Sequence, residues 1–226
     1  YFLYISTLNK RYYLERGIKS KRLFFSPYTV DSKLFCIQEK KISKELDLKI
    51  KFNNENPVML FASKLSERKN IMGLLKAYKN SFEGNLNLII IGNGKLSSSV
   101  KDFIKLNKLS TSIKYLGFIN QQSLPFIYAR SDIFILPSFS EKFGLVINEA
   151  MHGSCAIISS IEVGASYDIV KHKKNGYVYN SLENNSIEKA IRYCLKNKRY
   201  VDMGKKSKEI IENWNYDKTV KSLSEL

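Results

Sequence analysis

From residue 57 onward, short apolar runs alternate with segments in which apolar residues recur at helical spacing. Strands are predicted at the apolar runs that cover residues 58–62, 86–91, 113–116, 133–136, 155–159 and 177–179. Helices are predicted between and after these runs, over residues 71–78, 96–107, 121–130, 145–152, 166–171 and 186–197. Parallel strands need helical crossovers of this kind, and right-handed crossovers place helices on both faces of the sheet. The sequence therefore predicts an α/β fold built on a doubly wound, six-stranded parallel sheet.

The first part of the chain does not follow this alternation. A short strand is predicted at Phe2–Ser6, a basic helix over 7–16 and a second strand at Leu23–Ser26. We interpret residues 1–45 as the end of a preceding domain together with an interdomain hinge.

The remaining boundaries follow from polarity and from the end of the strand pattern. Lys49–Asn56 is polar and is predicted to be a linker or a surface loop. Residues 46–199 are predicted to form the sheet domain, and residues 200–226 to form C-terminal helices that pack back toward the preceding domain.

The net charge and the cysteine positions limit the classes of function that the chain can have. The chain has 37 basic and 21 acidic residues, which gives a net charge of +16. Because the basic residues are spread along the whole chain, we interpret them as solvated faces, with weak attraction to an anionic membrane as the second interpretation. No apolar run reaches the length of a membrane span. Cys36, Cys155 and Cys194 show no metal or redox spacing, so they are predicted to be buried thiols in a reducing cytosol.

The segment from Glu141 to Glu149 carries the strongest chemical signal. Two carboxylates bracket an apolar stretch led by Gly144, and this stretch follows the predicted strand over 133–136. A helix that begins after such a loop offers its first backbone amides to an anion. Ionised glutamates only accept hydrogen bonds, so they suit a ligand with hydroxyl groups. The pattern indicates a sugar attached to a phosphate, and a surface loop with two solvated glutamates stays open as the alternative.

A second loop is predicted to face this one. With the usual strand order 3-2-1-4-5-6, a crevice opens beyond the carboxyl ends of the first and fourth strands. Ser63–Asn70 would line one wall with Lys64, Arg68 and Lys69, and Pro137–Gly144 would line the other. A phosphate would thus meet cations on one side and backbone amides on the other.

These segments resemble the C-terminal domain of retaining glycosyltransferases of the group 1 (family 4-like) type. Glu141 and Glu149 match the E-x7-E motif of that family, and Phe61–Leu65 with Lys69 is similar to its basic loop. Further segments match in order, at residues 88–94, 115–119, 135–138, 164–170 and 175–178. The resemblance implies a Rossmann-like domain that forms the C-terminal half of a GT-B architecture.

The resemblance also implies residue roles. Lys64 and Lys69 would hold the donor diphosphate, and Glu141 would meet the transferred sugar, so these three are the predicted catalytic residues. The further donor-binding residues that it implies are Glu149 at the ribose, Phe143, Gly144, Leu145 and Val146 at the helix start, Gly117, Phe118 and Ile119 near the base, and Gly94. No metal or other cofactor is expected. The sequence departs from the family pattern at Ser63, Lys64, Ala165 and the Tyr28-Thr29 turn.

The expected activity is transfer of a hexose, with retention, from a UDP- or GDP-type nucleotide sugar to a glycan or lipid-linked acceptor. By analogy with the family, the protein would serve cell-surface polysaccharide biosynthesis in the cytoplasm, at the inner face of the plasma membrane. The family's first Rossmann domain is not part of this sequence, so the chain alone is expected to be an incomplete, inactive enzyme. A non-catalytic nucleotide-sugar-binding or scaffold domain is the alternative. Nucleic acid is not expected as a partner.

Overall fold

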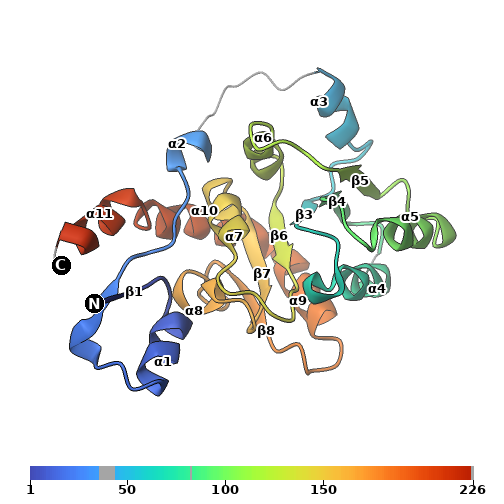
Figure 1. Cartoon of the computed structure of the whole chain (residues 1–226). Helices are drawn as coiled ribbons and strands as arrows, with labels where there is room; N and C mark the ends of the chain where they lie inside the picture. Colours follow the sequence, from blue (N-terminus) through green and yellow to red (C-terminus); the bar gives the residue numbers. More distant parts are fainter. Residues whose placement is uncertain (36–43, 82, 225–226) are drawn as a thin grey trace.

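The computed structural model describes residues 1–35, 44–81 and 83–224. Its centre is a six-stranded parallel sheet in the order β5-β4-β3-β6-β7-β8 (Figure 1). The strands are β3 (Val58–Ala62), β4 (Asn87–Ile91), β5 (Ile113–Gly117), β6 (Ile133–Leu136), β7 (Ala156–Ser160) and β8 (Gly176–Tyr179). Numbered from β3, this is the order 3-2-1-4-5-6, so the predicted doubly wound sheet is confirmed. The order reverses between β3 and β6.

Helices cover both faces of this sheet. They are α4 (Ile71–Ser81), α5 (Ser97–Leu106), α6 (Leu124–Ala129), α7 (Leu145–His152), α8 (Ala165–Asp168), α9 (Ser186–Leu195) and α10 (Arg199–Glu212). Successive residues of β3 point to opposite faces, so Phe61 packs with α4, α5 and α9 while Leu60 packs with α6, α7 and α8. Helix α10 contributes to both cores through Met203 and Ile211. The central strands β3, β4, β6 and β7 are buried on both faces, which explains why they read as continuous apolar runs.

Two predicted boundaries are wrong for identifiable reasons. The loop predicted over Lys49–Asn56 overlaps helix α3 (Lys44–Ile50), whose buried Ile50 lies one helical turn after Leu46. The helix predicted over 166–171 ends at Asp168. The buried side chain of Asn175 ends it, because this amide accepts from the backbone N–H of Lys171 at 2.6 Å and donates to the Ile169 carbonyl at 3.1 Å.

The N-terminal segment forms a small unit of its own. Strands β1 (Phe2–Tyr4) and β2 (Leu23–Phe25) pair in parallel, with α1 (Thr7–Glu15) and a 3-10 turn (Ser20–Arg22) between them. The backbone N–H of Thr7 donates to the Asp168 carboxylate at 3.1 Å, which ties this unit to the large domain.

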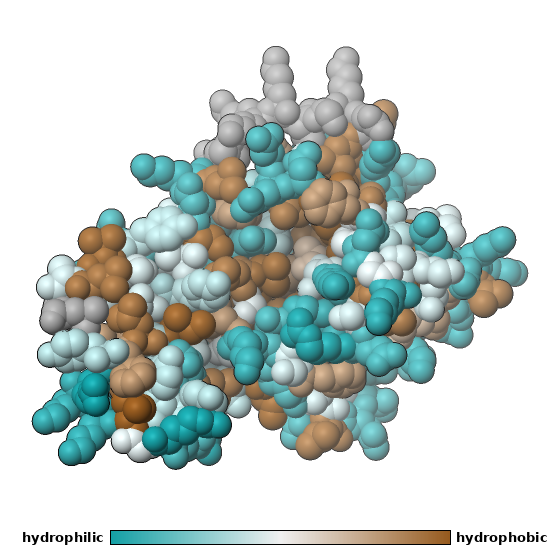
Figure 2. All heavy atoms as spheres, in the orientation of Figure 1, coloured by the Kyte–Doolittle hydropathy of each residue, from teal (hydrophilic) through white to brown (hydrophobic). Residues whose placement is uncertain are grey.

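The C-terminal helices pack against this N-terminal unit. Helix α11 (Tyr216–Ser224) lies beside β2, and α2 (Ser32–Phe35) lies on α7. Trp214 contacts the Phe25 ring at 5.4 Å between centroids and donates from Nε1 to the Tyr28 carbonyl at 3.0 Å. Apolar side chains gather over this end of the molecule, at the left of Figure 2. The division of the chain into domains stays a prediction, and the boundary placed after residue 45 lies within α3.

The other sequence expectations concern thiols and membrane spans. Cys155 and Cys194 are buried free thiols, as predicted, and burial raises the pKa of both. Cys36 lies outside the described residues. Within the described part of the chain, every helix is too short or too polar to cross a bilayer.

Candidate functional site

The loop after β3 is held against the end of β4 by backbone contacts. The N–H of Ser63 donates to the Ile91 carbonyl at 3.1 Å, and the N–H of Leu65 donates to the Asn93 carbonyl at 3.1 Å. A Cβ atom on Gly92 would lie 2.0 Å from the Ser63 carbonyl oxygen. Glycine is therefore required here by the close approach of two backbones, which places the basic loop at the carboxyl edge of the sheet.

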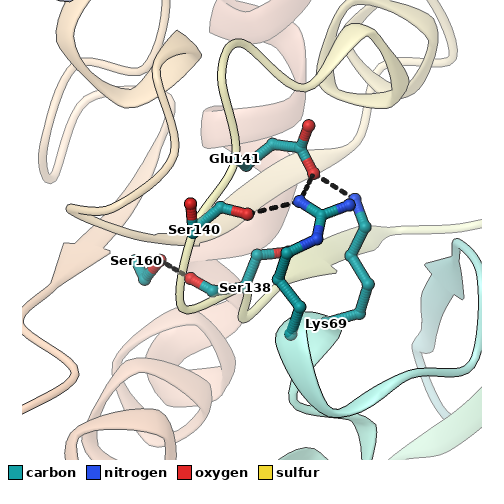
Figure 3. A network of polar contacts seen from close by, with 6 residues as sticks. Lys69, Ser138, Ser140, Glu141 and Ser160 are labelled. Carbon is teal, nitrogen blue, oxygen red and sulfur yellow. Dashed lines mark hydrogen bonds and ion pairs between the residues drawn. The ribbon is translucent and has the colours of Figure 1, made fainter.

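An ion-pair network joins this loop to the loop after β6. Within the 3-10 turn Glu67–Lys69, the Lys69 side chain turns inward and is 10% exposed, and its ammonium pairs with Oε2 of Glu141. Arg68 reaches the same oxygen at 3.3 Å and also donates to the Ser140 carbonyl. Figure 3 shows Lys69, Ser140 and Glu141 in this network. The backbone N–H of Phe139 donates to the Arg68 carbonyl at 2.9 Å. The two predicted walls of the crevice are thus in direct contact.

The start of α7 leaves backbone amides without a cap. Gly144 precedes the helix with φ of 97°, and no side chain accepts from the first turn. A Cβ atom on Gly144 would lie 3.1 Å from side-chain atoms of both Leu136 and Val163, so this position needs glycine for space as well as for conformation. The amides of Leu145 and Val146, at the positive end of the helix dipole, remain available to an anion.

A cavity of about 350 Å³ lies beyond the carboxyl ends of β3 and β4, between the loop after β5 and helices α6 and α7, next to the point where the strand order reverses. Lys64 and Glu149 line it together, and Phe118, Ile119 and Val146 form much of its apolar wall. Lys64 and Phe118 are exposed, and the Phe118 ring is 76% exposed. The cavity thus combines an exposed lysine, a carboxylate, the start of a helix and an aromatic face.

A buried tyrosine, Tyr128, forms a hydrogen bond with the Glu149 carboxylate. The Tyr128 hydroxyl donates to Oε2 of Glu149 at 2.7 Å. Burial raises the pKa of Glu149 above its ordinary value, and the Tyr128 hydrogen bond acts in the opposite direction. Burial and the adjacent carboxylate raise the pKa of Tyr128 well above its usual range, so its hydroxyl stays protonated as a donor.

A second cavity, of about 500 Å³, lies between α1 and the loop after β6. Glu141 lines it together with Glu162, and Ile5, Leu8 and Tyr12 supply apolar surface from the N-terminal unit. Glu141 and Glu149 therefore open into different cavities.

The sequence matches the family model described as glycosyl transferases group 1 over residues 43–214. This match covers most of the chain and includes both loops of the site. The protein is a member of the group 1 glycosyltransferase family.

Relatives and solved structures agree with this assignment. An uncharacterized glycosyltransferase of Methanocaldococcus jannaschii is 27% identical over 74% of this chain and 44% of its own length. Alpha-monoglucosyldiacylglycerol synthase of Acholeplasma laidlawii is 27% identical over 74% of this chain and 40% of its own length. The chain thus spans less than half the length of these two curated relatives. The crystal structure of Anabaena HepE in complex with UDP-glucose shares the fold, with a TM-score of 0.80 and 20% identity over 99% of this chain and 63% of that chain.

In this member of the group 1 family, the predicted site residues other than Phe143 fall into four sets. Lys64, Glu149, Val146, Phe118 and Ile119 line the 350 Å³ cavity, and Lys69 and Glu141 form the adjacent ion pair. Gly144 and Leu145 lie at the start of α7, while Gly94 packs on the Leu65 carbonyl and Gly117 lies near Asn93.

The side chain of Phe143 lines neither cavity. Its ring is 2% exposed, and it stacks on Trp214 with centroids 6.3 Å apart and contacts Tyr28 at 5.9 Å. Its side chain thus anchors the start of α7 to the N-terminal segment, which leaves only its backbone to meet a ligand.

The sequence prediction does not place Tyr128 in the site and does not include the contacts that Arg68 makes there. Tyr128 belongs to the apolar pattern of a helix, which indicates a core residue and conceals the hydroxyl contact with Glu149. Arg68 is predicted to line the crevice, but its bond to the Ser140 carbonyl depends on a loop from another strand. Among the residues that the structure describes, no cluster of three or more His, Cys, Asp or Glu side chains could hold a metal.

Proposed function

We propose that this chain is the donor-binding half of a retaining glycosyltransferase that transfers a hexose from a UDP- or GDP-type nucleotide sugar. The observation that carries the proposal is the cavity at the carboxyl edge of the sheet, next to its switch point, which Lys64, Glu149 and Val146 of the uncapped first turn of α7 line together. Parallel α/β sheets bind nucleotides at this position, beyond the carboxyl ends of the strands.

The diphosphate would lie between Lys64 and the α7 amides. Lys64 supplies a full positive charge from an exposed side chain, and the amides of Leu145 and Val146 add oriented dipoles. When the bond between the sugar carbon and the diphosphate oxygen breaks, negative charge grows on the diphosphate, and these fixed groups stabilise it. In this proposal they do so without a metal ion or other cofactor.

The ribose and the sugar would meet the two carboxylates. Oε2 of Glu149 is occupied by Tyr128, which leaves Oε1 for the ribose hydroxyls. Lys69 and Arg68 both contact Oε2 of Glu141, so Oε1 of this carboxylate is the oxygen left for hydroxyls of the transferred sugar. Phe118, with an exposed ring at the cavity rim, offers a stacking face to the base.

The names of similar proteins support the substrate class. HepE was solved with UDP-glucose, and the Acholeplasma relative is named for glucosyl transfer to diacylglycerol. We propose a glycan or lipid-linked acceptor, a role in surface polysaccharide biosynthesis, and action in the cytoplasm at the inner face of the plasma membrane. The net charge of +16 favours peripheral contact with anionic lipid there.

Calorimetry with UDP, GDP and ADP tests the donor site. We expect UDP or GDP to bind the wild type, and Lys64→Ala and Glu149→Ala each to weaken binding about tenfold or more, because each removes a charged hydrogen-bonding group. Lys105→Ala is the matched control, since Lys105 lies exposed on α5 and does not line the cavity. Addition of EDTA should leave the affinity unchanged.

Measurement of sugar transfer distinguishes the donor-binding half of an enzyme from the alternative, a non-catalytic binding or scaffold domain. We expect the chain alone to bind nucleotide without appreciable transfer, and a longer protein that includes a first Rossmann domain to transfer hexose with retention. Nucleotide binding without transfer in that longer protein would favour the scaffold. Absence of UDP and GDP binding, or tighter binding of single-stranded RNA, would remove the donor-site proposal altogether.

A further inference from the structure

Glu149 has an unusual environment for a carboxylate at a ligand site. It is half-buried, and none of the lysines and arginines in the described residues forms an ion pair with it. Its one side-chain partner among the described residues is the neutral hydroxyl of Tyr128, at 2.7 Å from Oε2. A neutral donor orients a carboxylate without cancelling its charge, so Oε1 keeps its full strength as an acceptor.

The position of Tyr128 is fixed by packing on several sides. Its side chain is fully buried, and its ring contacts Phe35 at 6.0 Å and Phe134 at 5.9 Å between centroids. Its carbonyl accepts from the backbone N–H of Ser131 at 3.0 Å. A Cβ atom on Gly153 would lie 2.7 Å from the Tyr128 Cβ, so helices α6 and α7 meet at van der Waals limits beside this residue. This packing therefore fixes the Tyr128 hydroxyl in its position beside the Glu149 carboxylate.

From this geometry we propose that Tyr128 is a positioning residue, which fixes the Glu149 carboxylate so that Oε1 faces the ribose hydroxyls of the nucleotide. Both residues line the same 350 Å³ cavity, with Tyr128 contributing from α6 and Glu149 from α7. The inference rests on the proposed donor site. In that site, the fixed Glu149 carboxylate would select ribonucleotides with free 2′ and 3′ hydroxyls. Loss of the Tyr128 hydroxyl frees the carboxylate to rotate and costs affinity only for ligands that use it.

The test compares Tyr128→Phe with wild type by calorimetry, using UDP and GDP and the 2′,3′-dideoxy form of each. We expect UDP or GDP to bind the variant about tenfold more weakly, since a hydrogen bond that orients a charged acceptor is lost. The dideoxy ligands lack the hydroxyls that Glu149 would accept from, so their affinity should be the same in both proteins. A purely structural role for Tyr128 would weaken all ligands alike.

Three further measurements sharpen the result. Tyr78→Phe is the matched control, because Tyr78 is also fully buried and donates from its hydroxyl, at 2.6 Å, to the Leu86 carbonyl in the other core. The Tyr78→Phe variant should lose stability and keep full nucleotide affinity.

Placing 4-aminophenylalanine at position 128 retains a hydrogen-bond donor there and should restore most of the UDP affinity. In Tyr128→Phe the pKa of Glu149 should rise further, so binding should begin to weaken at a higher pH than in wild type.

The outcomes separate this inference from the proposed function. Equal UDP affinity in wild type and Tyr128→Phe, or equal losses for UDP and its dideoxy form, overturns the positioning role and leaves the donor site standing. The positioning role is also overturned if the protein with 4-aminophenylalanine at position 128 binds UDP no more tightly than Tyr128→Phe does. A wild type that binds neither UDP nor GDP overturns both the donor site and the positioning role.

Discussion

Lys64 and Lys69 come from one loop, yet the structure predicts that replacement of Lys69 lowers the free energy of unfolding, whereas replacement of Lys64 leaves it almost unchanged. The Lys69 side chain is 10% exposed and pairs with Glu141, whose side chain is 17% exposed. Lys64 is exposed and forms no ion pair with any described residue. Lys69→Met keeps the aliphatic stem and removes the charge, so it leaves Glu141 with Arg68 as its remaining cation.

The expected loss can be worked from this geometry. Breaking a buried ion pair by removing one partner costs about 3–5 kcal/mol, because the other charge remains buried and unpaired. Arg68 still reaches Oε2 of Glu141 at 3.3 Å, from a side chain that is 53% exposed. This residual pairing lowers the expected cost of Lys69→Met to about 2–3 kcal/mol. For a chain of this size, that loss corresponds to a fall in melting temperature of about 4–12 °C.

Urea and thermal unfolding of a double-mutant cycle provide the assay. Lys69→Met/Glu141→Leu removes both charges, so it should be more stable than the sum of the two single losses predicts, by about 2 kcal/mol. Lys64→Met is the control, with a change within about 0.5 kcal/mol as for other exposed positions. The reasoning is refuted if Lys69→Met unfolds at the wild-type midpoint, or if the double variant loses only the sum of the single losses.

Two further predictions concern backbone strain and pH. Gly144→Ala should lose about 2 kcal/mol or more, because it combines a positive φ with contacts to Leu136 and Val163 at 3.1 Å, whereas Gly84→Ala, at φ 77° with open space around it, should lose only about 1 kcal/mol. Equal unfolding free energies for the two variants would contradict the close-contact argument. Burial and a nearby lysine lower the pKa of His152 to about 4, so the folded state binds fewer protons than the unfolded state between that pH and about 6.5. Stability should therefore fall as the pH drops through this window, and His152→Gln should flatten that part of the curve measured by urea unfolding; an unchanged slope would exclude His152 as its source.

The architecture could be predicted because its causes are local. Buried parallel strands such as 58–62 and 133–136 must be apolar on both faces, and the helices between them must carry an apolar stripe. Right-handed crossovers then limit the strand orders, and the carboxyl ends of β3 and β6 necessarily share an edge. The meeting of the basic loop with the Glu141 loop follows from that topology. The missed part of α3 and the early end of α8 depended instead on Ile50 and Asn175, whose burial is not visible in the local pattern.

The sequence by itself determined the doubly wound sheet, the family and the identity of the charged groups near its switch point. Only the tertiary structure decided that Lys69 turns inward to Glu141 while Lys64 stays exposed at the cavity, and that Tyr128 meets Glu149. The physical reason is that periodicity depends on neighbours along the chain, whereas the direction of a side chain depends on what packs beside it. Glu141 and Glu149 open into different cavities, because α1, distant in sequence, lines the cavity at Glu141, while α6 lines the cavity at Glu149.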